Sequence, residues 1–360
     1  MKRPNLFSSA TSELSQDAFI CWLLSWAKPE NKKYDAHLHA CGMAMIQKFF
    51  EKHDKPFPNE IRTVEVKKQD KNIDVLCIVN GEYPIIIEDK TRTSNHGDQL
   101  AKYFSVIKNR KDEKGNFRYK VEDIIPIYFK TYDQSCYKNV VDKNKYQPFT
   151  RADFLVILNK GVVELGISNA IFEDFREHLQ GIENRVQSYQ THNFNDWTSQ
   201  SWVGFYLKLQ QELGMGNWDK VNNPAKGFMG FSWGGIGSEK PYLQLEQHEL
   251  CFKVRVEGES KKELKKKQPD ELRKILKAET VKRRDIRNKW YKLIKSQCTD
   301  YGIALERPAN FGNGKWMTVI KAKDDYLHKN AEGIIDIHAT VQYLQKMDAF
   351  LKEMQKLDIA

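Results

Sequence analysis

Two carboxylates and a lysine lie at the facing ends of two neighbouring apolar segments. Asp74 stands near the start of the segment 73–79, and Glu88 and Lys90 stand at the end of the segment 83–90. Carboxylate oxygens are the hard ligands that Mg²⁺ prefers, and a bound Mg²⁺ or Mn²⁺ lowers the pKa of a water and stabilises phosphoryl charge. A neighbouring ammonium group can orient that water. These residue types predict metal-dependent cleavage of phosphodiester bonds, with Asp74, Glu88 and Lys90 as the catalytic group.

The turn between the two segments decides whether the three side chains meet. Glu88 and Lys90 share one face, because side chains two residues apart in a strand point the same way. A two-residue turn at Asn80-Gly81 would pair Asp74 with Ile87 and put it on the other face. A three-residue loop or a bulge would pair it with Glu88 instead. We expect the longer connection.

Helices and strands alternate in the first half of the chain. Helical periodicity and capping residues predict helices over residues 12–27, 41–52, 98–109, 152–158 and 170–179. Runs rich in β-branched residues predict strands over 61–67, 73–79, 83–90 and 124–130. The strands at 73–79 and 83–90 are apolar on both faces, as central strands are. The order of elements favours an α/β fold, a mixed sheet flanked by helices.

At 360 residues the chain is long for a single core, so two domains are expected. The sequence becomes polar and loses its periodicity around 183–200, which predicts domains at 1–185 and 186–360. In the second, we expect helices over 202–213 and 339–357, strands over 242–247, 250–257 and 316–323, and basic helices between them. This pattern indicates an α+β domain.

The net charge of +10 is concentrated in the segment 261–295, which holds fifteen Lys and Arg residues against five Asp and Glu. Such a concentration predicts contact with a nucleic-acid backbone, through residues such as Lys265, Lys266, Arg283 and Arg284. The plain alternative is a solvated, charge-rich helix. A membrane-surface helix fits less well, because the segment 261–267 has few apolar residues. Trp290 and Tyr291 are the aromatic side chains best placed for stacking on bases.

The six cysteines lie far apart without a C-x-x-C pair, which excludes the common zinc and iron–sulfur spacings and indicates reduced, intracellular thiols. The most apolar N-terminal run, 18–27, is only ten residues long and lacks a basic region before it. We therefore expect a cytoplasmic protein without membrane contact, for which homo-oligomers are possible. His96, in the loop after Lys90, is a weaker candidate for phosphate contact.

The motif Asp74, Glu88-Asp89-Lys90 and Gln99-Leu100-Ala101-Lys102-Tyr103 resembles the PD-(D/E)XK nuclease superfamily, and most closely its branch with a downstream Q-x-x-x-Y helix, as in RecB-type exonucleases. The resemblance covers about half of the chain. It implies a restriction-endonuclease-like αβββαβ core, the order predicted here for residues 12–130. Asn72-Ile73-Asp74 lacks the proline of the family's name, at a position that varies widely in the superfamily.

The resemblance also implies a role for each matching residue. Asp74, Glu88 and the backbone carbonyl of Asp89 would bind Mg²⁺ or Mn²⁺, with Glu13 as a further acidic ligand. Lys90 would be the catalytic lysine, and Gln99 and Tyr103 would line the nucleic-acid side of the site. DNA is the substrate that the family favours, and a stand-alone nuclease would suit defence against phages or mobile elements. The alternative is a non-catalytic nucleic-acid-binding or scaffold protein that keeps the same fold.

Overall fold

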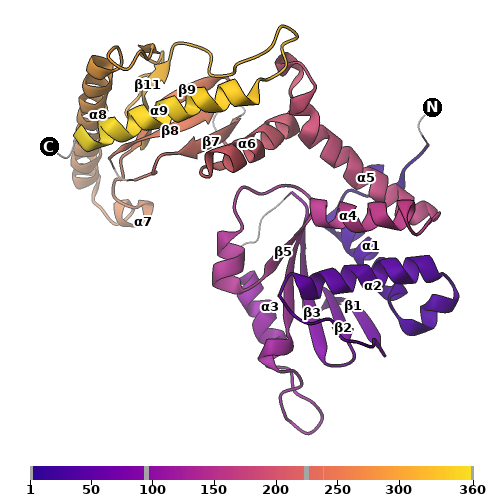
Figure 1. Ribbon diagram of the computed structural model, residues 1–360. Coiled ribbons are helices and arrows are strands. Elements are labelled where there is room, and N and C mark those ends of the chain that lie inside the picture. Colours follow the sequence, from indigo (N-terminus) through magenta and orange to yellow (C-terminus); the bar gives the residue numbers. More distant parts are fainter. Residues whose placement is uncertain (1–2, 93–96, 223–226, 238, 358–360) are drawn as a thin grey trace. The chain divides into compact units, whose positions relative to one another are not determined.

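The computed structural model describes residues 3–92, 97–222, 227–237 and 239–357, so His96 lies outside the described residues. The chain divides into two compact units, Met1–Asn184 and Arg185–Ala360, each with its own sheet and core (Figure 1). The predicted boundary was after residue 185. Helix α5 runs across this division, so the polar segment 183–200 begins with helical turns instead of a linker.

The first unit contains a five-stranded mixed sheet in the spatial order β1-β2-β3-β4-β5. Its strands are β1 (Val64–Asp70), β2 (Ile73–Val79), β3 (Tyr83–Lys90), β4 (Ile125–Lys130) and β5 (Gln147–Thr150). β1, β2 and β3 pair antiparallel, whereas β4 is parallel to both β3 and β5. The α/β fold class and the mixed sheet are confirmed.

Helices cover both faces of this sheet (Figure 1). They are α1 (Glu13–Trp26), α2 (Ala36–Glu51), α3 (Gln99–Lys108), α4 (Arg151–Val163) and α5 (Ala170–Gln187). From residue 75 onward, the odd-numbered apolar side chains of β2 and β3, such as Cys77 and Ile85, pack in the larger core with α1, α2, α4 and α5. The even-numbered ones, such as Leu76 and Ile86, pack against α3. The full burial of both sets makes β2 and β3 central strands, as predicted.

Local capping explains where the first two helices begin. The side chain of Ser12 accepts a hydrogen bond from the backbone N–H of Ser15 and caps α1, as predicted. The predicted start of α2 at residue 41 was wrong, because Asp35 caps the helix by accepting from the N–H groups of His37 and Leu38. The short strand β5 was not predicted, since four residues are too few to show an alternating pattern.

The second unit contains a six-stranded antiparallel sheet in the order β10-β11-β9-β8-β7-β6. Its strands are β6 (Asn217–Val221), β7 (Phe228–Trp233), β8 (Pro241–Glu246), β9 (Glu249–Arg255), β10 (Leu305–Glu306) and β11 (Trp316–Ala322). Its helices are α6 (Ser199–Leu213), α7 (Lys261–Leu264), α8 (Pro269–Gln297) and α9 (Ile337–Leu357). The predicted helices and three of these strands match within a few residues, and β6, β7 and β10 were missed.

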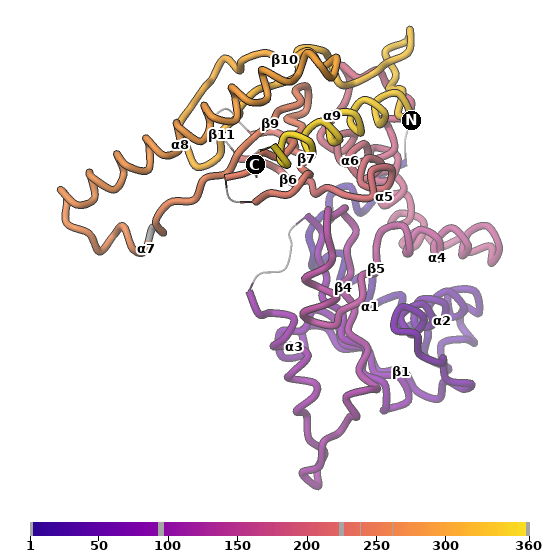
Figure 2. The backbone as a smooth tube through the Cα atoms, turned by 60° about the vertical axis from the view of Figure 1, so that its left-hand side comes forward, coloured from indigo at the N-terminus to yellow at the C-terminus, as the bar shows by residue number. Residues whose placement is uncertain are grey.

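The helices α6, α8 and α9 contribute to one apolar core on this sheet. α8 extends beyond the sheet, and its first turns project from the rest of the second unit together with α7 (Figure 2). The prediction that Trp290 offers a stacking face was wrong: it is 1% exposed, and its indole N–H donates to the Glu239 carbonyl. Among the described residues, none of the helices combines the length and the apolar character that crossing a membrane requires.

Candidate active site

The register of the β2–β3 hairpin brings the predicted site together. Val79 pairs with Tyr83 and Val75 pairs with Ile87, so three residues form the loop. Asn80 and Gly81 in that loop have φ angles of 55° and 70°, the left-handed conformation that tight turns need. Continued by one step, this register sets Asp74 opposite Glu88. The expectation of a three-residue connection is confirmed, and Asp74, Glu88 and Lys90 share one face.

The ammonium group of Lys90 lies among three carboxylates. Its Nζ atom is 2.5 Å from Glu88 Oε1, 3.8 Å from Asp74 Oδ2 and 3.9 Å from Glu13 Oε2. It also donates a hydrogen bond of 3.0 Å to the Asp89 carbonyl oxygen. Asp74 is oriented in turn, because its Oδ2 accepts a 2.9 Å hydrogen bond from the Asp89 N–H. The structure therefore places the carboxylates of Glu13, Asp74 and Glu88 and the backbone carbonyl of Asp89 around one lysine.

Burial makes the charges at this site costly. Burial and the neighbouring charge of Asp74 raise the pKa of Glu88 to about 8, although contact with Lys90 opposes the change. Burial likewise raises the pKa of Asp74. For Lys90, burial alone would lower the pKa, but the hydrogen bond to Glu88 and the surrounding carboxylates raise it overall. Lys90 therefore stays protonated, whereas the carboxylates of Glu88 and Asp74 bind a proton more readily than exposed carboxylates do.

The donor atoms fit a divalent cation held by two carboxylates. Glu88 is fully buried, its Oε2 has no hydrogen-bond partner among the described residues, and its carboxylate is in contact with that of Asp74. Two adjoining carboxylates require a shared proton or a cation, and Mg²⁺ takes only one or two protein carboxylates. Among the described residues, oxygens of Glu13, Asp74 and Glu88 do not all lie within 4.8 Å of one another.

In the described part of the chain, only one set of three potential metal ligands has its donor atoms within 4.8 Å of one another. It lies in the second unit and consists of Glu246, Glu249 and Cys251. Glu246 is paired with Lys253, and Glu249 with Lys321. Burial also raises the pKa of the Cys251 thiol to about 12, so the thiol stays protonated and the cluster lacks a third ligand for a hard cation.

The side chain of Asp89 points to the opposite face of the sheet. It accepts a hydrogen bond from Gln16 Nε2, while Gln16 Oε1 accepts one of 2.7 Å from the Thr131 hydroxyl. Burial and the charge of Asp17 raise the pKa of Asp89, and burial and the charge of Asp74 raise that of Asp17 to about 6. Sequence reasoning missed Gln16 and Asp17. Their positions three and four residues after Glu13 place all three on one face of α1, a signal that was available.

A second lysine borders the site and was also missed. Lys130 ends β4 as Lys90 ends β3, and the two are register partners. Its Nζ donates a 2.7 Å hydrogen bond to the Thr91 carbonyl, while the Thr91 N–H donates one of 3.1 Å to Glu13 Oε1. Burial lowers the pKa of Lys130 to about 8. These bonds tie the chain after β3 to both α1 and β4, and so hold Glu13 near Lys90.

The predicted Q-x-x-x-Y pair lies on the first turns of α3. The Gln99 side-chain amide donates a 3.0 Å hydrogen bond to the Tyr103 hydroxyl, one helical turn away. Burial, with the charges of Glu88, Tyr103 and Asp74, raises the pKa of Tyr146 well above its ordinary value. The Tyr146 hydroxyl has no hydrogen-bond partner among the described residues. Tyr146, which the sequence did not indicate, is therefore buried close to Tyr103, Glu88 and Asp74.

The four basic residues proposed as nucleic-acid contacts are not equivalent. Lys265 and Lys266 are exposed in the turn after α7, and Arg284 is exposed beside Asp285. Arg283 is different, because it is ion-paired with Glu279 at 2.9 Å and only 17% of its side chain is exposed.

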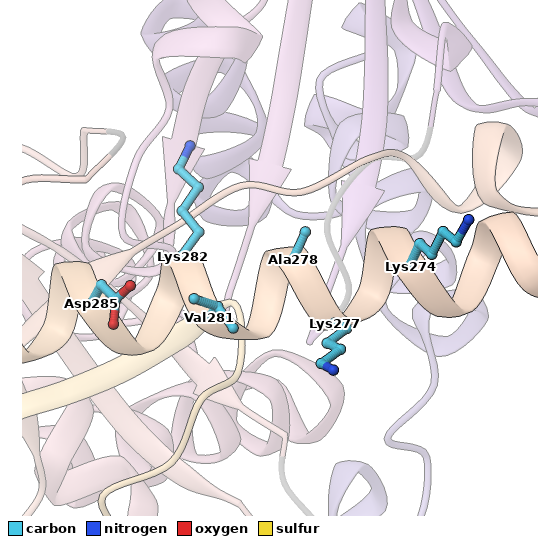
Figure 3. Close-up of a pocket in the computed structure, with 6 residues that line it drawn as sticks. All are labelled: Lys274, Lys277, Ala278, Val281, Lys282 and Asp285. Atoms are coloured by element: carbon cyan, nitrogen blue, oxygen red, sulfur yellow. The ribbon is translucent and has the colours of Figure 1, made fainter.

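α8 presents a further basic surface, which we call the lysine face. It is lined by Lys274, Lys277, Ala278, Val281, Lys282 and Asp285 (Figure 3). Figure 3 shows the three ammonium groups directed away from the helix axis, with Ala278 and Val281 between them. Lys274 and Lys277 form no ion pair with any described residue, whereas Lys282 lies 2.5 Å from Glu239.

A comparison with known protein families finds a match that spans the first unit. A family model described as the PD-(D/E)XK nuclease superfamily matches residues 4–194, which is more than half of the chain and includes every residue of the candidate active site. Searches of curated proteins and of solved structures gave no match.

Proposed function

Since the chain belongs to the PD-(D/E)XK nuclease superfamily, we propose that it hydrolyses phosphodiester bonds of DNA with Mg²⁺ or Mn²⁺. Nucleases of this superfamily generally use divalent metal ions. The observation that carries the proposal is the convergence of Glu88 and Asp74 on Lys90, with Nζ–O distances of 2.5 and 3.8 Å. DNA and the particular metals are parts of this proposal.

Each residue of the site has a distinct task in the proposed reaction. Asp74 and Glu88 would hold the ion, which would acidify a water and stabilise charge on the phosphoryl oxygens. Lys90 would orient the attacking water and stabilise the negative charge that grows in the transition state. Glu13 on α1 would help to position Lys90, whose Nζ lies 3.9 Å from Glu13 Oε2. Glu13 also holds the chain after β3 by accepting a hydrogen bond from the Thr91 N–H. Gln99 and Tyr103 would contact the nucleic acid from α3.

Incubation with linear, circular and single-stranded DNA and with RNA tests the proposal. We expect cleavage of DNA in Mg²⁺ or Mn²⁺, none in EDTA, and a loss of roughly 100-fold or more in Asp74→Asn, which removes a metal-binding charge. Asp70→Asn is the matched control, because Asp70 lies on the neighbouring strand β1, pairs with Arg110 after α3 and lies outside the site. Binding without metal-dependent cleavage would instead favour the non-catalytic alternative.

We also propose that the lysine face of α8 contacts the DNA backbone. Charge reversal in the double variant K274E/K277E should lower DNA affinity. It should also reduce the slope of log Kd against log salt concentration by about two, which is about one for each lost phosphate contact. Fluorescence anisotropy in EDTA over a range of salt concentrations measures both effects. R283Q is the comparison variant, and we expect a smaller change because Glu279 already neutralises Arg283. Equal slopes for wild type and K274E/K277E would refute this contact.

A further inference from the structure

One tryptophan of the second unit is exposed where the other tryptophans are covered. Trp316, the first residue of β11, keeps 49% of its surface accessible, whereas the other seven are buried or partly buried. Trp316 pairs with Arg255 on β9, and the edge of its ring faces buried Tyr242 at a centroid distance of 6.3 Å. The exposed ring is a large, flat apolar surface, and a ligand that covered it would gain stability by burying that surface.

Cationic side chains flank the exposed ring. The Arg255 guanidinium carbon is 4.8 Å from the ring centroid, and the Lys315 Nζ is 6.0 Å from it. Both cations pair with a single carboxylate, that of Glu257, so the group keeps an excess positive charge. An aromatic face beside excess positive charge complements a ligand that has both a planar ring and a negative charge.

The loop before Trp316 holds a second pairing of aromatic and cationic groups. The Arg287 guanidinium carbon lies 3.7 Å from the Phe311 ring centroid, and that of Arg307 lies 4.4 Å from it. Buried Arg287 also donates to the carbonyls of Phe311 and Gly312, at 2.6 and 2.5 Å, and so fastens the loop to α8. Arg307 is exposed and forms no ion pair with any described residue.

We propose that this surface binds unpaired nucleotides of a single-stranded nucleic acid. A base would stack on Trp316, while Arg255 and Lys315 beside its ring would contact the adjoining phosphates. Stacking on an exposed ring requires an open base face, which duplex DNA does not offer, and base–aromatic stacking tolerates any sequence. The lysine face of α8 lacks an aromatic ring and so fits the backbone alone. This inference rests on the proposed function for the identity of the polymer, and extends it to single-stranded segments.

Fluorescence anisotropy with the full-length protein in EDTA tests the inference without cleavage. The probes are a labelled oligothymidylate and a duplex of the same length. We expect Trp316→Ala to weaken oligothymidylate binding by roughly 5- to 100-fold, the range for loss of one stacked base, with little change for the duplex. Trp316→Phe should keep most of the affinity. Tyr301→Ala, which removes another exposed aromatic ring of the second unit, should leave it unchanged. Circular dichroism checks that each variant is folded.

Three outcomes would overturn the inference. They are unchanged oligothymidylate affinity in Trp316→Ala, an equal loss for single strand and duplex, and a wild-type protein that does not bind the single strand. Each would leave the proposed nuclease function intact if metal-dependent cleavage persists. Conversely, Trp316-dependent binding together with absent cleavage would support the inference and refute the nuclease proposal alone.

Discussion

Lys90→Ala should lower the rate of metal-dependent DNA cleavage by roughly 100- to 1000-fold, the usual cost of removing one preorganised donor from a reaction centre. The expectation follows from the position of Nζ, which is held by Glu88 and faces Asp74. Lys90 is 7% exposed, so water is a poor substitute for its charge. Initial rates with a labelled linear substrate at saturating metal measure the loss. Affinity for DNA in EDTA should change far less than the rate.

The control for this substitution is another lysine of the same sheet. Lys67 lies on the edge strand β1, where it pairs with Glu65 in solvent, and Lys67→Ala should cleave like wild type. Because Lys90→Ala leaves Glu88 buried without its partner, its thermal unfolding must be measured alongside. Lys90→Arg retains the positive charge in a group of different shape, so it distinguishes an effect of charge from an effect of the position of the ammonium group. A folded Lys90→Ala variant that cleaves at the wild-type rate would place the active site elsewhere.

The register of one hairpin explains why much of the site could be predicted. Glu88 and Lys90 are neighbours through strand alternation alone, and a three-residue loop is sufficient to align Asp74 with them. Lys130 and Tyr146 could not be found in this way. They reach the site through parallel pairing of β4 with β3 and through the segment before β5, both of which depend on contacts between distant parts of the chain.

The second unit shows the limits of composition as a guide. Trp290 and Arg283 lie in the basic segment, yet helical periodicity turns Trp290 into the core and brings Arg283 one turn from Glu279. Trp316 was expected to begin a strand. Its exposure follows from its place at the end of β11 away from β10, which pairs only with residues 321 and 322. Strand β6 was missed because three of its five residues are polar or charged, and β7 was missed because Gly230 interrupts its apolar run.

The metal-free protein should lose stability as the pH rises from 6 to 8. The pKa of Glu88 is about 8 in the folded protein against an ordinary value of 4.5. The folded state therefore keeps a proton that the unfolded state has lost, so this stabilisation is complete below 4.5 and disappears as the pH rises through 8. Glu88 alone contributes a slope of about 1.4 kcal/mol per pH unit, and the raised pKa of Asp89 adds a slope of the same sign. Below pH 6 the raised pKa of Asp17 also makes stability fall as the pH rises. Above pH 8 the lowered pKa of Lys130 makes stability increase with pH, so the contribution of Glu88 is measured between pH 6 and 8.

A divalent ion should reverse this loss, because it replaces the proton between Glu88 and Asp74. Thermal unfolding in EDTA and in Mg²⁺ or Mn²⁺ should differ more at pH 8 than at pH 6, and a metal concentration 100 times Kd should add about 2.7 kcal/mol to the free energy of unfolding. Glu88→Gln cannot ionise at this position, so its stability should fall less steeply with pH than that of wild type and respond weakly to metal. If Glu88→Gln shows the same metal-induced stabilisation as wild type, the ion binds at another place and Glu88 is not its ligand.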